Sequence, residues 1–124
     1  MQYKPQVRLI IAGGRDFTDY ELLQDRCDFK LSSVDKTHDI TIISGGARGA
    51  DSLAQLYSAE RNYALEIMEA DWDTHGKSAG YKRNQAMSDV ATHLIAFWDG
   101  ESRGTKHMID VATRAGHVVH VVNY

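Results

Sequence analysis

Residues 40–51 decide the fold: they read Ile40-Thr-Ile-Ile-Ser-Gly-Gly-Ala-Arg-Gly-Ala-Asp51. A nearly continuous apolar run ends at Ser44 and passes directly into a loop rich in glycine. Runs of this kind are typical of strands that are buried on both faces, as in parallel sheets. A glycine-rich loop that leads from such a strand into a helix presents backbone N–H groups at the helix N-terminus. The stretch therefore predicts a strand-loop-helix unit whose loop suits an anion.

Four similar apolar runs extend this pattern along the chain. The predicted strands are residues 7–12, 40–44, 64–68, 93–98 and 117–122. Segments with helical spacing separate them, and this alternation is typical of a parallel sheet. The sequence thus predicts an α/β fold: a single domain, residues 1–124, with a Rossmann-like, doubly wound, parallel five-stranded sheet and helices on both faces.

The helical segments carry end signals and apolar stripes. Thr18 and Glu21 match a capping box, and Gly116 suits the end of the last helix. The stripes predicted to face the sheet are Leu22, Leu23, Cys27 and Leu31; Leu53, Leu56 and Tyr57; Met87, Val90 and Ala91; and Met108, Val111, Ala112 and Ala115.

Most of the glycines lie in the loops that follow the first, second and fourth predicted strands. Ligands of open α/β sheets bind outside the carboxyl ends of the strands, where these loops are expected to meet. Each loop also carries an arginine (Arg15, Arg48 and Arg103), which favours a phosphate or pyrophosphate; the alternative is that the glycines only serve tight turns. The candidate ligand-binding residues of these loops are Gly13, Gly14, Arg15, Ser44, Gly45, Gly46, Arg48, Gly49, Asp51, Trp98, Gly100, Ser102, Gly104 and Thr105.

Residues 72–84 form the densest polar and aromatic segment. Trp72 could stack on a base there, and Lys77, Lys82 and Arg83 could contact a phosphate group. Asn84 is a further candidate ligand-binding residue of this segment. The alternative is a solvated loop in which Trp72 packs on the sheet edge. Asp51 is expected either to stabilise a helix N-terminus or to contact the ligand.

Composition narrows the function classes. The net charge of -3 argues against a surface built wholly for nucleic acid. Cys27 is the only cysteine, so an intramolecular disulfide is excluded. The polar start of the chain does not resemble a signal peptide, and no apolar run approaches the roughly 18 residues of a membrane span. A cytoplasmic protein is expected, without a metal site, because the histidines are scattered, and without a cofactor.

Four ordered motifs resemble the YspA-like, cpYpsA-related branch of the SLOG superfamily over about residues 8–122. They are Gly13-Gly14-Arg15-Asp16-Phe17, Ser44-Gly45-Gly46-Ala47-Arg48-Gly49-Ala50-Asp51, Ala79-Gly80-Tyr81-Lys82-Arg83-Asn84-Gln85-Ala86-Met87, and the segment from Phe97-Trp98-Asp99-Gly100 to Lys106-His107-Met108-Ile109. The resemblance implies a Rossmann-like fold and a nucleotide-derived, ADP-ribose-like small molecule at the glycine loops.

Related families suggest two alternative functions. The Lonely Guy phosphoribohydrolases of this superfamily carry Gly-Gly-x-Gly-Thr-x-x-Glu, but Met108 stands at the glutamate position here, and a thioether cannot do acid–base work. A nucleotide N-glycosidase would therefore need Asp16, Asp99 or Glu101. DNA-processing protein A, which binds single-stranded DNA, is similar at Ser44-Gly45 and Arg83-Asn84. Relatives of this fold often pair, so a homodimer is a further expectation.

Overall fold

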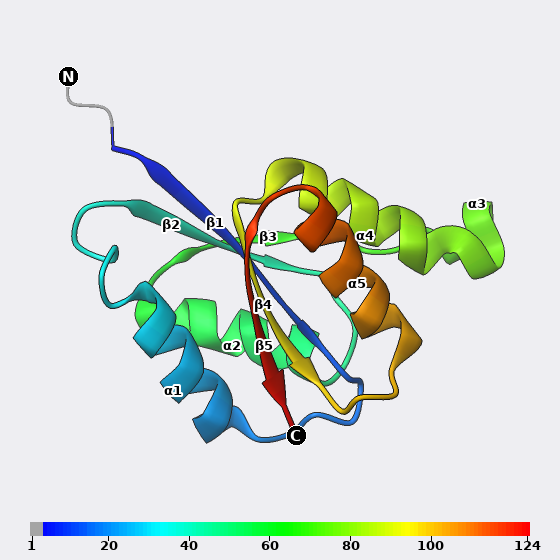
Figure 1. Cartoon of the computed structure of the whole chain (residues 1–124), viewed down its shortest axis with the longest axis horizontal. Coiled ribbons are helices and arrows are strands. Elements are labelled where there is room, and N and C mark those ends of the chain that lie inside the picture. The colour runs from blue at the N-terminus through cyan, green and yellow to red at the C-terminus, as the bar shows by residue number, and fades with distance from the viewer. Residues whose placement is uncertain (1–3) are drawn as a thin grey trace.

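The computed structural model describes residues 4–124, and its centre is a parallel sheet (Figure 1). The strands lie in the order β3-β2-β1-β4-β5, and every neighbouring pair is parallel. The predicted Rossmann-like α/β fold is confirmed, and each predicted strand begins and ends within one residue of an observed strand. The strands are β1 (Gln6–Gly13), β2 (Asp39–Ser44), β3 (Ala64–Ile67), β4 (His93–Trp98) and β5 (Val118–Asn123).

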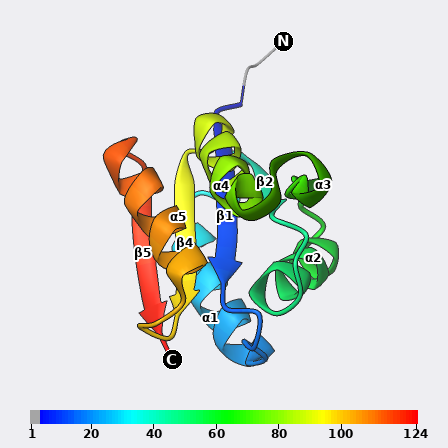
Figure 2. The ribbon, with the colours of Figure 1, turned by 90° about the vertical axis from the view of Figure 1, so that its right-hand side faces the viewer.

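Helices cover both faces of this sheet (Figure 2). Helices α1 and α2 pack on one face, and α4 and α5 pack on the other. A short helix and a 3₁₀ turn precede α4. The helices are α1 (Tyr20–Leu31), α2 (Ala50–Arg61), α3 (Trp72–His75), η1 (Gly76–Ser78), α4 (Ala79–Val90) and α5 (Arg103–Arg114).

The central strand β1 shows why its apolar run is continuous. Leu9 and Ile11 belong to the core beneath α1 and α2, whereas Ile10 and Ala12 belong to the core beneath α4 and α5. Successive side chains of a strand point to opposite faces, so a strand covered on both sides needs apolar residues at every position.

Three details of the predicted helices are corrected. Asp19, not Thr18, caps α1, and its side chain accepts from the Leu22 N–H at 3.1 Å. Leu56 is 45% exposed, because α2 turns its neighbour Tyr57 toward the sheet instead. Val90 is also exposed, at the last residue of α4.

Two other predicted details concern the ends of segments. Ala115 is exposed because α5 ends at Arg114, while Gly116 adopts a φ of 82° just beyond it, as predicted for a helix end.

The prediction that the chain does not start with a signal peptide concerns its first residues, and residues 1–3 lie outside the described part of the structure. In residues 4–124, no helix is long and apolar enough to cross a membrane.

The order of the strands creates a switch point between β1 and β4. The chain runs from β1 outward through β2 to β3, then crosses back to β4 and continues to β5. The loops that leave β1 and β4 therefore turn to opposite sides, which opens a crevice at the carboxyl edge of the sheet.

Candidate functional site

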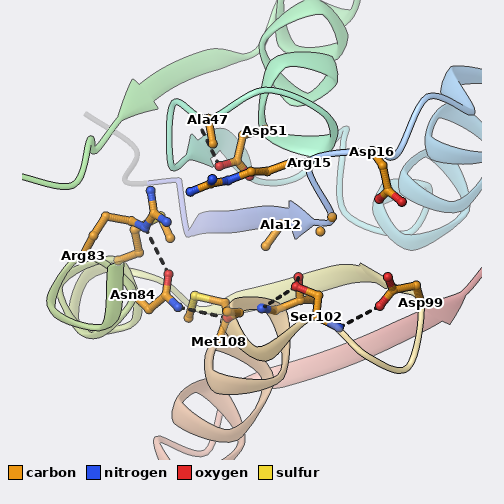
Figure 3. Close-up of a pocket in the computed structure, with 15 residues that line it drawn as sticks. Ala12, Arg15, Asp16, Ala47, Asp51, Arg83, Asn84, Asp99, Ser102 and Met108 are labelled. Atoms are coloured by element: carbon orange, nitrogen blue, oxygen red, sulfur yellow. Dashed lines mark hydrogen bonds between the residues drawn. The ribbon is translucent and has the colours of Figure 1, made fainter. Parts of the chain in front are cut away.

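A pocket of about 400 Å³ lies at this switch point (Figure 3). Its volume is within the range of roughly 300–1,000 Å³ typical of small-molecule sites. Its lining comes from the loops after β1, β2 and β4 and from the facing sides of α4 and α5. The lining residues are Ala12, Gly13, Gly14, Arg15, Asp16, Ala47, Asp51, Arg83, Asn84, Met87, Asp99, Ser102, Gly104, Thr105 and Met108.

Many of the candidate residues meet in this pocket. The structure brings together Gly13, Gly14, Arg15, Asp16, Asp51, Arg83, Asn84, Asp99, Ser102, Gly104 and Thr105. The apolar part of the lining was missed by sequence reasoning. It is formed by Ala12, Met87 and Met108, together with Ala47.

A second, smaller hollow of about 270 Å³ adjoins the pocket. Three more of the candidate ligand-binding residues line it, namely Gly45, Gly46 and Trp72. We call it the Trp72 hollow. Its lining residues are Arg15, Gly45, Gly46, Ala47, Glu69, Ala70, Trp72 and Arg83.

The remaining candidates line neither space. Ser44 and Gly49 hold the β2–α2 loop, and the indole N–H of Trp98 donates to Ser102 O at 3.0 Å. The other three candidates are exposed residues of the loops, namely Arg48, Gly100 and Glu101.

Gly49 shows that one glycine serves the contact between two loops. Its φ is 77°, and a Cβ there would lie 2.3 Å from Gly14 O. The neighbouring Ala50 N–H donates to the same carbonyl at 3.2 Å. A side chain at position 49 would therefore separate the β1–α1 loop from the β2–α2 loop.

Arg83 reaches the pocket from α4 and is held by two neighbours. Its Nη1 donates to Gly45 O at 2.7 Å, and its Nε donates to Asn84 Oδ1 at 3.0 Å. Burial lowers the pKa of Arg83, and the nearby Arg15 acts in the same direction. The Arg15 side chain extends toward Arg83 in Figure 3. Within residues 4–124, neither arginine forms an ion pair with a carboxylate.

Asn84 is buried and fixes Arg83 relative to α5. Its Nδ2 donates to Gly104 O at 3.2 Å and lies 3.1 Å from His107 Nδ1. Burial lowers the pKa of His107, which favours the neutral ring, and the contact with the Asn84 amide N–H requires the tautomer whose Nδ1 is unprotonated. The chain of contacts therefore joins the pocket edge of α4 to the start of α5.

Asp51 is the buried carboxyl of the pocket. Its Oδ2 accepts from the Ala47 N–H at 3.2 Å, and its side chain is almost wholly covered. Burial raises the pKa of Asp51 to about 6, although Arg83, the Ala47 amide and Arg15 favour the ionised form. Sequence reasoning placed Asp51 at a helix start but gave no signal of this burial.

Ser44 fixes the loop that carries Asp51. Its hydroxyl donates to Asp51 O at 2.9 Å and accepts from the Gly46 N–H at 3.2 Å. Ser44 is fully buried, so its role in the structure is to hold the loop backbone.

Two other carboxylates lie at the far end of the pocket from Arg83 (Figure 3). Asp99 Oδ1 accepts from the N–H groups of Glu101 and Ser102, both at 2.8 Å, and these bonds lower the pKa of Asp99. Asp16 Oδ1 accepts from the Tyr124 hydroxyl at 2.7 Å. The pocket therefore has a cationic end and an anionic end.

The first turn of α5 forms one wall between these ends. Ser102 caps the helix, with its Oγ 3.4 Å from the Thr105 N. The N–H groups of Arg103 and Gly104 precede any intrahelical acceptor, as in the first turn of every helix. A Cβ added to Gly104 would meet nothing within 4 Å, so a ligand has room to approach this backbone. No group of three or more potential metal-ligating side chains occurs in residues 4–124.

Sheet order and pocket together define an α/β protein of the Rossmann-like class with a polar site at its switch point. The family model of the YspA, cpYpsA-related SLOG family matches residues 7–75. The chain therefore belongs to this family, which confirms the resemblance found in its motifs.

Two further comparisons, one of sequence and one of structure, extend this result. The Gene 61 protein of Mycobacterium phage D29 is 32% identical over 123 residues, which cover 94% of this chain and 95% of that protein. The structure of DNA processing protein A from Helicobacter pylori, described for its single-stranded DNA binding mode, superimposes with a TM-score of 0.69 at 17% identity. The match covers 95% of this chain and 65% of that chain, and at this identity it shows a shared fold.

Proposed function

We propose that this protein binds a phosphate-containing, nucleotide-derived small molecule, such as ADP-ribose, in the pocket between β1 and β4. The observation that carries the proposal is the convergence of Arg15 and Arg83 at one end of the pocket, where neither guanidinium forms a salt bridge to a carboxylate of residues 4–124. Arg83 is half-buried and Arg15 is exposed, and arginines whose guanidinium groups are not bound directly by a carboxylate can donate to an anionic ligand.

Arg83 supplies the more specific contact. Only Gly45 O and Asn84 Oδ1 accept from its guanidinium in the described chain, which leaves further N–H donors for a phosphate. Arg15 adds a second charge from the β1–α1 loop. The first-turn amides of α5 can support an anionic group that lies deeper in the pocket.

The opposite end of the pocket suits a sugar. The carboxylates of Asp16 and Asp99 accept hydrogen bonds, as ribose hydroxyl groups would require. Met87 and Met108 supply an apolar wall that can cover the non-polar face of a sugar.

Isothermal titration calorimetry with ADP-ribose, AMP and ribose 5-phosphate tests this proposal. The wild-type protein is expected to bind, and Arg83→Gln to bind at least about tenfold more weakly through lost charge-assisted hydrogen bonds. Arg26→Gln, which removes an exposed arginine of α1, is the matched control. Folded wild-type protein that binds none of these ligands at millimolar concentration would overturn the proposal.

The carboxylates at the sugar end favour a second candidate, cleavage of an N-glycosidic bond. Such a reaction develops positive charge on the sugar, which Asp16 or Asp99 could stabilise. Glu101, the third candidate carboxylate, does not line the pocket and is therefore the weaker candidate. Chromatography for free base after incubation with nucleoside monophosphates tests this activity. Full activity in Asp16→Asn would remove Asp16 from the mechanism.

Single-stranded DNA binding is a third candidate, favoured by the shared fold with DNA processing protein A. It requires a basic track and a steep dependence on salt. A mobility-shift experiment with oligonucleotides at low salt tests it, and the absence of a shift would exclude it.

A further inference from the structure

The pocket and the Trp72 hollow share a boundary, and the boundary is cationic. Arg15, Ala47 and Arg83 line both spaces. The two guanidinium groups therefore stand in the middle of one longer groove, and neither lies at its end. A ligand that contacts both arginines has room on either side of them.

The charges along this groove alternate. Glu69 lies in the Trp72 hollow, and Asp16 and Asp99 lie at the other end of the pocket. Asp51 is the one carboxyl near the middle. Its carboxyl faces the positive charges of Arg83 and Arg15, and two arginines against one carboxyl leave the middle of the groove with a net positive charge. Carboxylates repel phosphate at both ends, so the middle is the place where a phosphate gains most.

We infer that the ligand has two uncharged parts joined through a phosphate bridge. One part is a nucleoside whose aromatic base lies in the Trp72 hollow, the bridge lies between Arg15 and Arg83, and the other part is a sugar in the main pocket. This inference rests on the proposed function and assigns each part of the nucleotide to a place in the groove. The chemical class is a nucleoside diphosphate sugar or a dinucleotide-like molecule.

Trp72 is the group that would receive the base. It begins α3, and half of its surface is exposed. Asp71 caps this short helix by accepting from the Thr74 N–H at 3.1 Å. An ideal Cβ on Gly80 would lie 3.5 Å from Trp72 Cη2, so one edge of the indole lies beside the first turn of α4. An indole fixed at its edge and partly open to solvent is suited to stacking on a base.

Glu69 strengthens the assignment of the base to this side. Its carboxylate accepts hydrogen bonds and donates none when ionised. It would repel a phosphate but can accept from the exocyclic amino group of a base. An aromatic surface beside such an acceptor fits an amino-bearing base such as adenine.

Calorimetry on Trp72→Ala, Trp72→Phe and the wild-type protein tests the inference with ADP-ribose, AMP and ribose 5-phosphate. Trp72→Ala is expected to lower the affinity for ADP-ribose and for AMP about tenfold, because stacking is lost. Its affinity for ribose 5-phosphate should stay within about twofold of the wild-type value. Trp72→Phe should retain most of the affinity for AMP. Phe29→Ala, which removes a 79% exposed ring from α1, is the matched control.

The outcomes separate the inference from the proposed function. Unchanged AMP binding in Trp72→Ala, with normal binding by the wild-type protein, would overturn the inference alone. An equal loss for ribose 5-phosphate would overturn it as well, because that ligand has no base. A wild-type protein that binds none of the three ligands would overturn both.

Discussion

Asp51 and Arg83 lie against the same buried glycine, Gly45. A Cβ at that position would be 2.8 Å from Asp51 Oδ2 and 2.6 Å from Arg83 Nη1. The carbonyl of Gly45 also accepts from Arg83 Nη1 at 2.7 Å. The absence of a side chain at position 45 thus lets a helix α4 arginine and a helix α2 carboxyl approach the same loop.

Gly45→Ala is expected to destabilise the fold by about 1–3 kcal/mol, because overpacking forces neighbouring groups to move. The substitution should also lower the affinity for phosphate-containing ligands, since Arg83 would be displaced from the loop. Urea unfolding measures the first effect, and calorimetry with ADP-ribose measures the second.

Gly104→Ala is the control for this substitution. A Cβ there meets nothing within 4 Å, and alanine favours a helix over glycine. The control should be at least as stable as the wild-type protein. Equal stability of Gly45→Ala and the wild-type protein would contradict the predicted crowding.

Asp51→Asn is expected to increase stability at neutral pH. Burial raises the pKa of Asp51 to about 6 in the folded protein, above its ordinary value of 3.8. The proton therefore binds the folded state more tightly. Its stabilising contribution is complete below about pH 4 and is lost as the pH rises through about 6.

The measurement compares the unfolding free energies of Asp51→Asn and the wild-type protein from pH 4 to pH 8. The asparagine oxygen can still accept from the Ala47 N–H. The difference should grow in favour of the variant by about 1–3 kcal/mol as the pH rises. A difference that does not change with pH would show that the pKa of Asp51 is not raised. Comparing the two proteins removes the contributions of the other titrating groups.

Tyr124→Phe is expected to free the Asp16 carboxylate. The hydroxyl of Tyr124 donates to Asp16 Oδ1 at 2.7 Å, and its ring packs against Phe17 with centroids 4.8 Å apart. Phenylalanine keeps the ring contact and removes only the hydrogen bond. Stability should fall by about 0.5–1.5 kcal/mol, and affinity for ribose 5-phosphate should fall severalfold.

Tyr63→Phe is the matched control, because the Tyr63 hydroxyl has no hydrogen-bond partner within residues 4–124. It should change neither quantity. If Tyr124→Phe binds ribose 5-phosphate as well as the wild-type protein does, the hydroxyl has no part in arranging the sugar end of the pocket.

The five parallel strands and the loops of the site could be predicted from the sequence for a simple reason. Apolar runs such as residues 93–98 reflect burial on both faces, which is a local property of the sequence. The carboxyl ends of parallel strands share one edge of a sheet, so the sequence alone predicts that Gly14 and Gly104 belong to one site.

The rest of the site depends on how the helices pack, which spacing along the chain does not show. The helical spacing predicts Met87 and Met108 only as core residues that face the sheet. They also form a wall of the pocket because α4 packs beside α5. The pKa of Asp51 similarly depends in part on Arg83, which lies far away in the sequence. Trp98 is a candidate ligand-binding residue in the sequence, but it lines neither the pocket nor the Trp72 hollow, and its indole N–H donates to Ser102 O.

Asn84→Ala tests whether Arg83 needs its neighbour to hold the ligand-binding position. Asn84 is 4% exposed, accepts from Arg83 Nε at 3.0 Å and donates to Gly104 O at 3.2 Å. Alanine removes both hydrogen bonds, one of them to the half-buried guanidinium of Arg83, which is expected to cost about 1–3 kcal/mol of stability. It also frees the Arg83 side chain, so the affinity for ADP-ribose should fall.

The two effects are separated by Gln85→Ala, which alters the adjacent, exposed position of α4. Gln85 bonds only to Asp89, one turn along the same helix, and its loss should cost at most about 0.5 kcal/mol. Urea unfolding and calorimetry on both variants give the comparison. If Asn84→Ala loses stability but binds ADP-ribose as the wild-type protein does, Arg83 is positioned by Gly45 O alone. If both quantities fall, the contact from Asn84 to Gly104 links the two walls of the pocket, and the phosphate site depends on the packing of α4 against α5.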